Sequence, residues 1–210
     1  MTRVCIICEG QTEQEFVETC LYRTFLAKGI YLSTDHLRGN VSIQRVAQFA
    51  RNNYANYDFL TTLIDFYGFK QNPCANRHCL ELEILTATQR LFDNLNPAAK
   101  FLPYVQMYEF EGLLFSDISK FAWVMLDDWN ADYAAQLQAI RAAVDNPECI
   151  NNSPSTAPSK RLQRIFGKSY DKVEHGALIA EDIGLTTLRA QCPNFNQWIT
   201  WLESLSPNRN

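Results

Sequence analysis

Five acidic residues of this chain stand at or just past the end of an apolar run. They are Glu9, Glu13, Asp65, Glu109 and Glu111. Carboxylates that gather in one place repel one another, which costs stability unless a cation is bound. Their hard oxygen atoms suit Mg²⁺ or Mn²⁺, and such ions can hold a phosphodiester and activate water. The pattern therefore indicates a divalent-metal site, although acids at strand ends are also typical of solvated loops.

The first pair of acids lies on either side of a predicted tight turn. Apolar residues 4–8 form a predicted buried strand, and Glu9 follows it directly. Thr12 and Glu15 have the spacing of a capping box, which predicts that a helix starts near Glu13. Glu9 and Glu13 could then face a single cation.

Strands and helices are predicted to alternate through the first half of the chain. The predicted strands cover residues 4–8, 30–33, 59–64 and 102–108. The predicted helices run from Glu13 to Gly29, from a cap at Ser42, and from Leu80 to Leu95. This alternation predicts an α/β fold with a mainly parallel sheet flanked by helices, and the carboxyl ends of such strands meet at one edge.

The pattern changes after about residue 116 and becomes helical. Helices are predicted over residues 132–144, 160–166, 173–182 and 196–205, with a loop over 147–158. We therefore expect an α/β core over residues 1–116. Residues 117–210 are expected to form a helical appendage packed on it, within one compact domain.

Composition limits the possible partners and the compartment. The 210 residues have a formal net charge of −4, so the chain has no overall positive charge that would indicate nucleic-acid binding. A polyanion such as nucleic acid could bind only through a local basic patch or a bound metal, or after delivery by a partner protein. The seven scattered cysteines are typical of free thiols in a reducing compartment. The early strand argues against a signal peptide, and no apolar run approaches the ~20 residues that span a bilayer, so a cytoplasmic protein is expected.

Two further groups of residues could carry chemistry. Ser159, Lys160 and Arg161 form a basic cluster at a predicted helix start, suited to phosphate binding or equally to a solvated helix face. Cys74 and the segment His78-Cys79 could suggest zinc, but a structural zinc site needs four ligands and no second pair is evident, although the distant Cys149, His175 or Cys192 could complete one. A loop with incidental thiols is the preferred interpretation. Cys5 and Cys8, which lie inside a strand, are expected in the core.

The order of the acidic motifs resembles the Toprim fold, the metal-binding domain of topoisomerases, primases and several nucleases. The pattern is similar to its version in OLD-family nucleases. Glu9 and Glu13 match E-x-x-x-E, and Asp65 matches the first acid of D-x-D. The pair in Glu109-Phe110-Glu111 looks like the third motif, where the family usually has Ser-x-Glu. Lys160 is a candidate for the family's downstream basic residue.

The whole chain looks more closely like a family of small stand-alone Toprim-like proteins. Their marks are E-G-x-T-E, D-[FY]-Y-G, [HY]-E-F-E, P-S-K-R and a closing C-P-x-F-x-x-W, which is present here as residues 192–198. One departure from the broader pattern is Tyr67, which replaces the second acid of D-x-D.

The resemblance implies a Mg²⁺- or Mn²⁺-dependent nuclease that cuts DNA or RNA. Glu9, Asp65 and Glu109 would be the principal ligands, Glu13 and Glu111 would complete a second site or position water, and Lys160 would stabilise developing charge. It also implies an AAA- or ABC-type ATPase partner, in arrangements that suggest anti-phage defence. The alternative is a regulatory subunit that holds metal or phosphate without turnover, which the missing acid at Tyr67 and the net charge favour. The sequence gives no oligomeric state.

Overall fold

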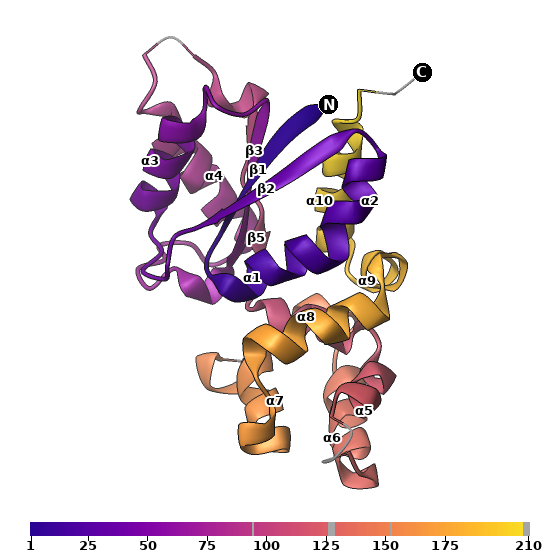
Figure 1. The fold of residues 1–210 in the computed structure, drawn as a ribbon. Coiled ribbons are helices and arrows are strands. Elements are labelled where there is room, and N and C mark those ends of the chain that lie inside the picture. Colours follow the sequence, from indigo (N-terminus) through magenta and orange to yellow (C-terminus); the bar gives the residue numbers. More distant parts are fainter. Residues whose placement is uncertain (94, 126–128, 152, 208–210) are drawn as a thin grey trace.

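A parallel sheet forms the centre of the fold (Figure 1). The computed structural model describes residues 1–93, 95–125, 129–151 and 153–207. The five strands are β1 (Thr2–Cys8), β2 (Ile30–His36), β3 (Phe59–Asp65), β4 (Phe101–Leu102) and β5 (Val105–Gln106). Their order is β2-β1-β3-β4, and β5 also pairs with β3. Every pairing between these strands is parallel, which confirms the predicted α/β class.

The predicted strand over residues 102–108 is divided into the short strands β4 and β5. Pro103 lies between them and has no backbone N–H with which to continue the ladder. The buried side chain of Thr62 bridges the gap, because its hydroxyl donates to the Tyr104 carbonyl (2.6 Å) and accepts from the Tyr104 N–H (2.8 Å). The interruption therefore leaves no unpaired backbone group at Tyr104.

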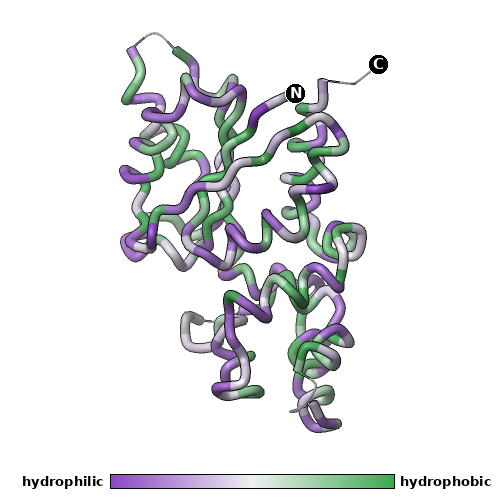
Figure 2. Tube along the Cα trace, viewed as in Figure 1, coloured by the Kyte–Doolittle hydropathy of each residue, from purple (hydrophilic) through white to green (hydrophobic). Residues whose placement is uncertain are grey.

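Helices cover both faces of the sheet. One face carries α1 (Gln11–Phe16), a π-helical segment (Val17–Leu21), α2 (Tyr22–Ala27) and α10 (Pro193–Ser204), and the other carries α3 (Ile43–Asn53) and α4 (Arg77–Gln89). Cys8 belongs to the first core and Cys5 to the second, so both are buried in the core as predicted. Hydrophobic and hydrophilic stretches alternate along the helices in Figure 2, as expected where one side of each helix is buried.

The first helix begins two residues earlier than predicted. Gly10 is its N-cap residue, and the carboxylate of Glu13 accepts a hydrogen bond from the Gly10 N–H (2.9 Å). Thr12, predicted to be the cap, lies inside the helix and is buried. Glu13 therefore caps the helix from its third position, and Glu15 takes no part in a capping box.

The second half of the chain is helical as predicted, with two further helices. Its helices are α5 (Phe121–Val124), α6 (Ala131–Ala142), α7 (Pro158–Phe166), α8 (Lys172–Ile183), α9 (Leu185–Gln191) and α10, of which α5 and α9 are the two further ones. In Figure 1, α5, α6 and α7 project below the sheet, α8 crosses between them and the sheet, and α10 returns beside α2. Trp198 of α10 donates to Thr61 Oγ1 of β3 (2.9 Å) and stacks on Tyr104. Thus α10 contributes to the core of the sheet.

Short 3₁₀ helices occupy several connections. They are Phe66–Gly68, Pro97–Ala99, Phe110–Ser116, Ile118–Lys120, Pro147–Cys149, Pro154–Thr156 and Gly167–Ser169. The helix predicted to reach Leu95 ends at Gln89, and Asn94 lies outside the described residues.

Cys74 and Cys79 form a disulfide, so the expectation of free thiols is wrong for this pair. Asn72 accepts from the Cys74 N–H and Asn76 from the Cys79 N–H, both at 2.9 Å, and these bonds fold the segment into the first turn of α4. The Cα atoms of the two cysteines are 5.6 Å apart as a result. Sulfur atoms bonded to each other are not available as zinc thiolates. Among the described residues, no helix is both long enough and apolar enough to cross a membrane.

Candidate acidic site

The five predicted acids, here called the acidic site, gather at the carboxyl edge of the sheet. Glu9 follows the last residue of β1, Asp65 is the last residue of β3, and Glu109 lies shortly after β5. Glu13 is in the first turn of α1, and Glu111 is in the first turn of the 3₁₀ helix that follows Glu109. Because the strands are parallel, their carboxyl ends share one edge, where open α/β sheets bind ligands.

Three of these carboxyl groups are removed from solvent. Glu111 is 0% exposed, Glu13 is 3% and Asp65 is 4%, whereas Glu9 and Glu109 are half-buried. A buried carboxylate is costly unless it is paired or hydrogen-bonded. The partners of each group therefore decide the electrostatics of the site.

Each partner of the acidic site comes from a different part of the chain. Glu13 accepts from the Gly10 N–H, as described above. Glu109 Oε2 accepts from the backbone N–H of Ser159, in the first turn of α7 (2.8 Å). Lys172, the first residue of α8, places its Nζ 3.1 Å from Glu111 Oε1 and 3.7 Å from Asp65 Oδ2. One ammonium group thus lies between two of the acids.

Several carboxylate oxygens of the site remain without a partner. Glu9 Oε2, Asp65 Oδ1 and Glu111 Oε2 are buried and form no hydrogen bond to any described residue. Buried polar atoms are nearly always satisfied in folded proteins, and unsatisfied ones are typical of functional sites and of sites that take an ion or water. These oxygens are the acceptors that the acidic site offers to a ligand.

The electrostatics of the site oppose full ionisation of its acids. Burial, reinforced by the charge of Glu13, raises the pKa of Glu9 to about 7. Burial also raises the pKa values of Asp65 and Glu111, although the ammonium of Lys172 acts in the opposite direction. Burial alone would lower the pKa of Lys172, but Asp65 and Glu111 outweigh it, so its pKa is raised and Lys172 is charged. Further positive charge would stabilise the ionised acids.

Gly68 allows the Glu9 carboxylate to occupy its position. A Cβ atom added at Gly68 would lie 2.0 Å from Glu9 Oε2 and 2.7 Å from Glu9 Cδ. Any other residue at this position would therefore displace the carboxylate. The D-[FY]-Y-G motif supplies both the acid of β3, Asp65, and the space beside Glu9.

Tyr67 directs its hydroxyl toward the loop before α7. The hydroxyl accepts a hydrogen bond from Asn151 Nδ2, and the Tyr67 N–H donates to the Tyr108 carbonyl (3.2 Å). Tyr67 therefore supplies no carboxylate at the position where the Toprim resemblance expects the second acid of D-x-D.

The donor chemistry of the site suits a hard cation, but the side chains are not preset around one. As they stand, no three His, Cys, Asp or Glu side chains of the described residues could hold a metal ion together. The unpartnered oxygens of Glu9, Asp65 and Glu111 are the ligand type that Mg²⁺ and Mn²⁺ prefer. Coordination would require rotation of these side chains.

The predicted basic cluster is only partly brought to the acids. Ser159 reaches Glu109 through its backbone N–H. Lys160 is exposed and donates to Gln163 Oε1 (3.3 Å), while Arg161 donates through Nε to the Thr156 carbonyl (2.7 Å). No described contact joins Lys160 or Arg161 to the acidic site.

Sequence reasoning missed Lys172, the cation that contacts the acids. One signal was available, because Asp171 has the character of an N-cap residue and Lys172 then becomes the first helical residue. A cation is disfavoured at the positive end of a helix dipole. A lysine at that position therefore indicates that carboxylates from other parts of the chain compensate its charge.

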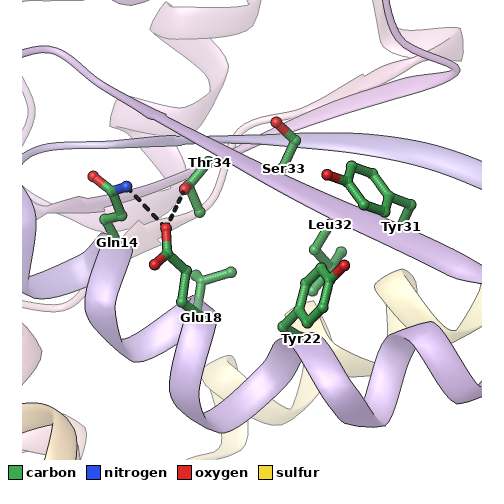
Figure 3. Close-up of a pocket in the computed structure, with 8 residues that line it drawn as sticks. Gln14, Glu18, Tyr22, Tyr31, Leu32, Ser33 and Thr34 are labelled. Carbon is green, nitrogen blue, oxygen red and sulfur yellow. Dashed lines mark hydrogen bonds between the residues drawn. The ribbon is translucent and has the colours of Figure 1, made fainter.

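A separate cavity of about 450 Å³ lies along β2 and contains none of the five acids (Figure 3). Tyr22 and Tyr31 line one part of it. At the other end Glu18 Oε1 accepts from Gln14 Nε2 (2.9 Å) and Thr34 Oγ1 (3.2 Å). The polar groups at that end are paired with one another, which distinguishes this cavity from the acidic site.

Three solved structures resemble this chain, and all are of the C-terminal region of the OLD protein of Xanthomonas campestris pv. campestris. One is 17% identical with a TM-score of 0.44, covering 96% of this chain and 97% of the other. A second is 17% identical with a TM-score of 0.45 and 95% coverage of both chains. A third is 14% identical with a TM-score of 0.45, covering 96% and 98%.

A search of curated protein sequences finds no match. A family model does match, and it spans residues 8–203, from the end of β1 to the last turn of α10. The match includes all five acids, Lys172 and the disulfide. The chain belongs to the family described as "Domain of unknown function (DUF4276)".

Proposed function

We propose that this protein is a divalent-metal-dependent nuclease that hydrolyses DNA or RNA phosphodiesters. One observation carries the proposal: five carboxyl groups lie at the carboxyl edge of a parallel sheet, where Lys172 is the one ammonium among the described residues that contacts them and reaches two, and three of their buried oxygens have no described partner. Such a site gains stability from a divalent cation, and a divalent cation at a carboxylate cluster is suited to phosphodiester hydrolysis.

The residues of the acidic site have distinct proposed roles. Glu9, Asp65 and Glu109 are the principal ligands for Mg²⁺ or Mn²⁺, and Glu13 and Glu111 complete a second site or position a water molecule. The bound ion would polarise a phosphate oxygen and lower the pKa of a bound water.

Lys172 takes the charge-stabilising role that the Toprim resemblance implies for Lys160. Its ammonium already lies beside Asp65 and Glu111, and its side chain is 38% exposed, so it can contact both the acids and an incoming phosphate. A fixed positive charge beside the reacting phosphate stabilises the transition state. Ser159 has a supporting role, since its N–H orients the Glu109 carboxylate.

An ATPase partner is part of the proposal. The chain has a net charge of −4, so its own long-range field does not attract nucleic acid. Delivery of the substrate by an AAA- or ABC-type ATPase, as the Toprim resemblance implies, would overcome this repulsion. A role in anti-phage defence rests on the same resemblance.

The test is metal-dependent cleavage by the purified protein, alone and with any AAA- or ABC-type ATPase that is encoded beside it. Labelled single- and double-stranded DNA and RNA are incubated with Mn²⁺, Mg²⁺ or EDTA. Wild type should cleave only with metal, and Asp65→Asn should be inactive while Asp93→Asn, an exposed acid remote from the site, remains active.

The second candidate is a regulatory subunit that binds metal or phosphate without turnover. Tyr67 favours it, because the position that would add a carboxylate instead binds Asn151. Metal binding at the acidic site without cleavage by the complete complex, with its trigger present, would decide for this candidate. Absence of cleavage, of metal binding and of phosphate binding would refute both candidates.

A further inference from the structure

A second cavity, of about 420 Å³, is lined by Tyr108, the residue directly before Glu109, and is here called the Tyr108 cavity. Its wall includes Asn76, Arg77 and His78 from the start of α4, and Met107 and Tyr108 from the segment between β5 and the Glu109 carboxylate. Its size is within the range of cavities that take small ligands. Because Tyr108 directly precedes Glu109, the cavity wall and the acidic site share this segment of the chain.

Tyr108 belongs to a cluster of three half-buried aromatic rings. Its ring centroid is 5.6 Å from that of Tyr67 and 6.4 Å from that of Phe66. Phe66 and Tyr67 directly follow Asp65, and Tyr108 directly precedes Glu109. The ring cluster therefore connects the segment that carries Asp65 with the segment that carries Glu109. The rings are tilted against one another, with the planes of Tyr67 and Tyr108 38° apart, and of the three Tyr108 lines the cavity.

The backbone at Tyr108 is held in an unusual conformation. Its φ is 64°, in the left-handed region that bulky residues rarely adopt. The Tyr108 carbonyl accepts from the Tyr67 N–H, and this bond helps to fix the conformation. Residues held in such conformations cluster at ligand sites. An unusual backbone conformation thus occurs at a residue that lines the cavity.

The remaining wall combines the apolar Met107 and Cys149 with polar side chains, and it carries little free negative charge. Glu148 also lines the cavity, but its two oxygens accept from the N–H groups of Asn194 (2.8 Å) and Phe195 (3.0 Å). Arg77 lies 3.7 Å from Glu81, and His78 is exposed. An aromatic surface with amide, imidazole and guanidinium groups around it matches a nucleobase, which needs a stacking partner and hydrogen bonds at its edge.

We propose that the Tyr108 cavity receives the base of an unpaired nucleotide whose neighbouring phosphate reaches the acidic site. This inference rests on the proposed function and narrows its substrate to single-stranded or locally unpaired nucleic acid. A base within a duplex is stacked on its neighbours and would have to flip out before it could enter. Stacking tolerates any sequence, because every base has an aromatic face. We therefore expect the site to select unpaired nucleotides without regard to base sequence.

The experiment measures binding, so that it does not depend on cleavage. A short single-stranded oligonucleotide that contains one 2-aminopurine, and its duplex, are titrated with protein in the presence of Ca²⁺. The wild-type protein should quench the 2-aminopurine fluorescence of the single strand and bind it more tightly than the duplex. Tyr108→Asn removes the ring and keeps a residue that tolerates positive φ. It should abolish the quenching and weaken single-strand binding by about 5- to 100-fold.

Three further variants complete the test. Tyr108→Phe keeps the ring and should retain quenching and binding. His78→Ala, an exposed change that leaves the backbone of Tyr108 intact, should weaken binding and provides a second reading if Tyr108→Asn fails to fold. Tyr31→Asn removes an exposed tyrosine at the β2 cavity and should bind as wild type. Circular dichroism and melting temperatures check the folding of each variant.

The outcomes separate this inference from the proposed function. Quenching that depends on Tyr108, without metal-dependent cleavage in a parallel assay, would keep the base site and reject the nuclease. Metal-dependent cleavage that Tyr108→Asn leaves unchanged on single and double strands would keep the nuclease and overturn the base site. Equal binding of single strand and duplex, or no binding of either, would also overturn it.

Discussion

Lys172 places its ammonium 3.1 Å from the carboxylate of Glu111, a residue that is completely buried. The lysine begins α8 and the glutamate lies in the 3₁₀ helix after β5, so the ion pair joins the helical second half of the chain to the edge of the sheet. The pair has an electrostatic function, because it compensates part of the charge of the acidic site. It also makes α8 part of that site.

Removal of the Lys172 charge should destabilise the protein and abolish activity. Lys172→Met leaves Glu111 buried without its cation, which should lower the free energy of unfolding by about 1 to 3 kcal/mol. Urea unfolding in EDTA measures this change. If the proposed roles are correct, metal-dependent cleavage should also be lost in this variant.

Lys160→Met is the matched comparison, because Lys160 is exposed and contacts Gln163. Loss of cleavage in Lys160→Met, with full activity in Lys172→Met, would return the charge-stabilising role to Lys160. The exposed Lys168→Met controls for the loss of one positive charge.

Divalent metal should stabilise the wild-type protein. An ion that binds the native state alone raises the melting temperature as its concentration exceeds the dissociation constant. Mn²⁺ or Mg²⁺ should therefore raise the melting temperature, and Glu9→Gln should remove most of the rise. Differential scanning fluorimetry measures both. Glu15→Gln, an exposed change on α1, is the control, and an equal response in Glu9→Gln would place the metal elsewhere.

The metal-free protein should lose stability as the pH rises toward neutrality. The pKa of Glu9 is raised from 4.5 to about 7 in the folded state, so the folded protein binds its proton more tightly than the unfolded chain does. The stabilisation is complete below about pH 4.5 and is lost as the pH rises through about 7. The loss from Glu9 should be on the order of 1 to 3 kcal/mol.

Urea unfolding in EDTA at several pH values measures this dependence. Glu9→Gln should flatten the curve between about pH 4.5 and pH 7. A free energy of unfolding that rises with pH over this interval in the wild-type protein would contradict the raised pKa of Glu9. Added Mn²⁺ should reverse the trend, because metal binding requires the deprotonated carboxylates.

Gly68→Ala should impair the metal response more than the fold. The new Cβ would lie 2.0 Å from Glu9 Oε2, and the carboxylate can rotate away because it is the end of a flexible side chain. The metal-free melting temperature should change little, while the Mn²⁺-induced rise should shrink. The double variant with Glu9→Gln should show no further loss, since both changes act on one carboxylate. Additive losses would mean that Gly68 acts independently of Glu9.

Local patterns in the sequence were sufficient to predict the α/β class and the edge of the sheet that carries the acids. Apolar runs predicted β1 and β3, and amphipathic spacing predicted α3 with its cap at Ser42, which accepts from the Arg45 N–H as expected. An acid directly after a parallel strand has its place fixed by the strand. The positions of Glu9 and Asp65 at one edge could therefore be predicted without coordinates.

Only the tertiary structure decided how these acids are compensated. Lys172, Gly68 and the Ser159 N–H meet the acidic site through contacts between elements distant in the chain, and no local periodicity encodes such contacts. The same holds for the Tyr67 hydroxyl, which binds Asn151. Strand and helix formation depends on neighbours within a few residues, whereas the pairing of buried charges depends on how the elements pack against one another.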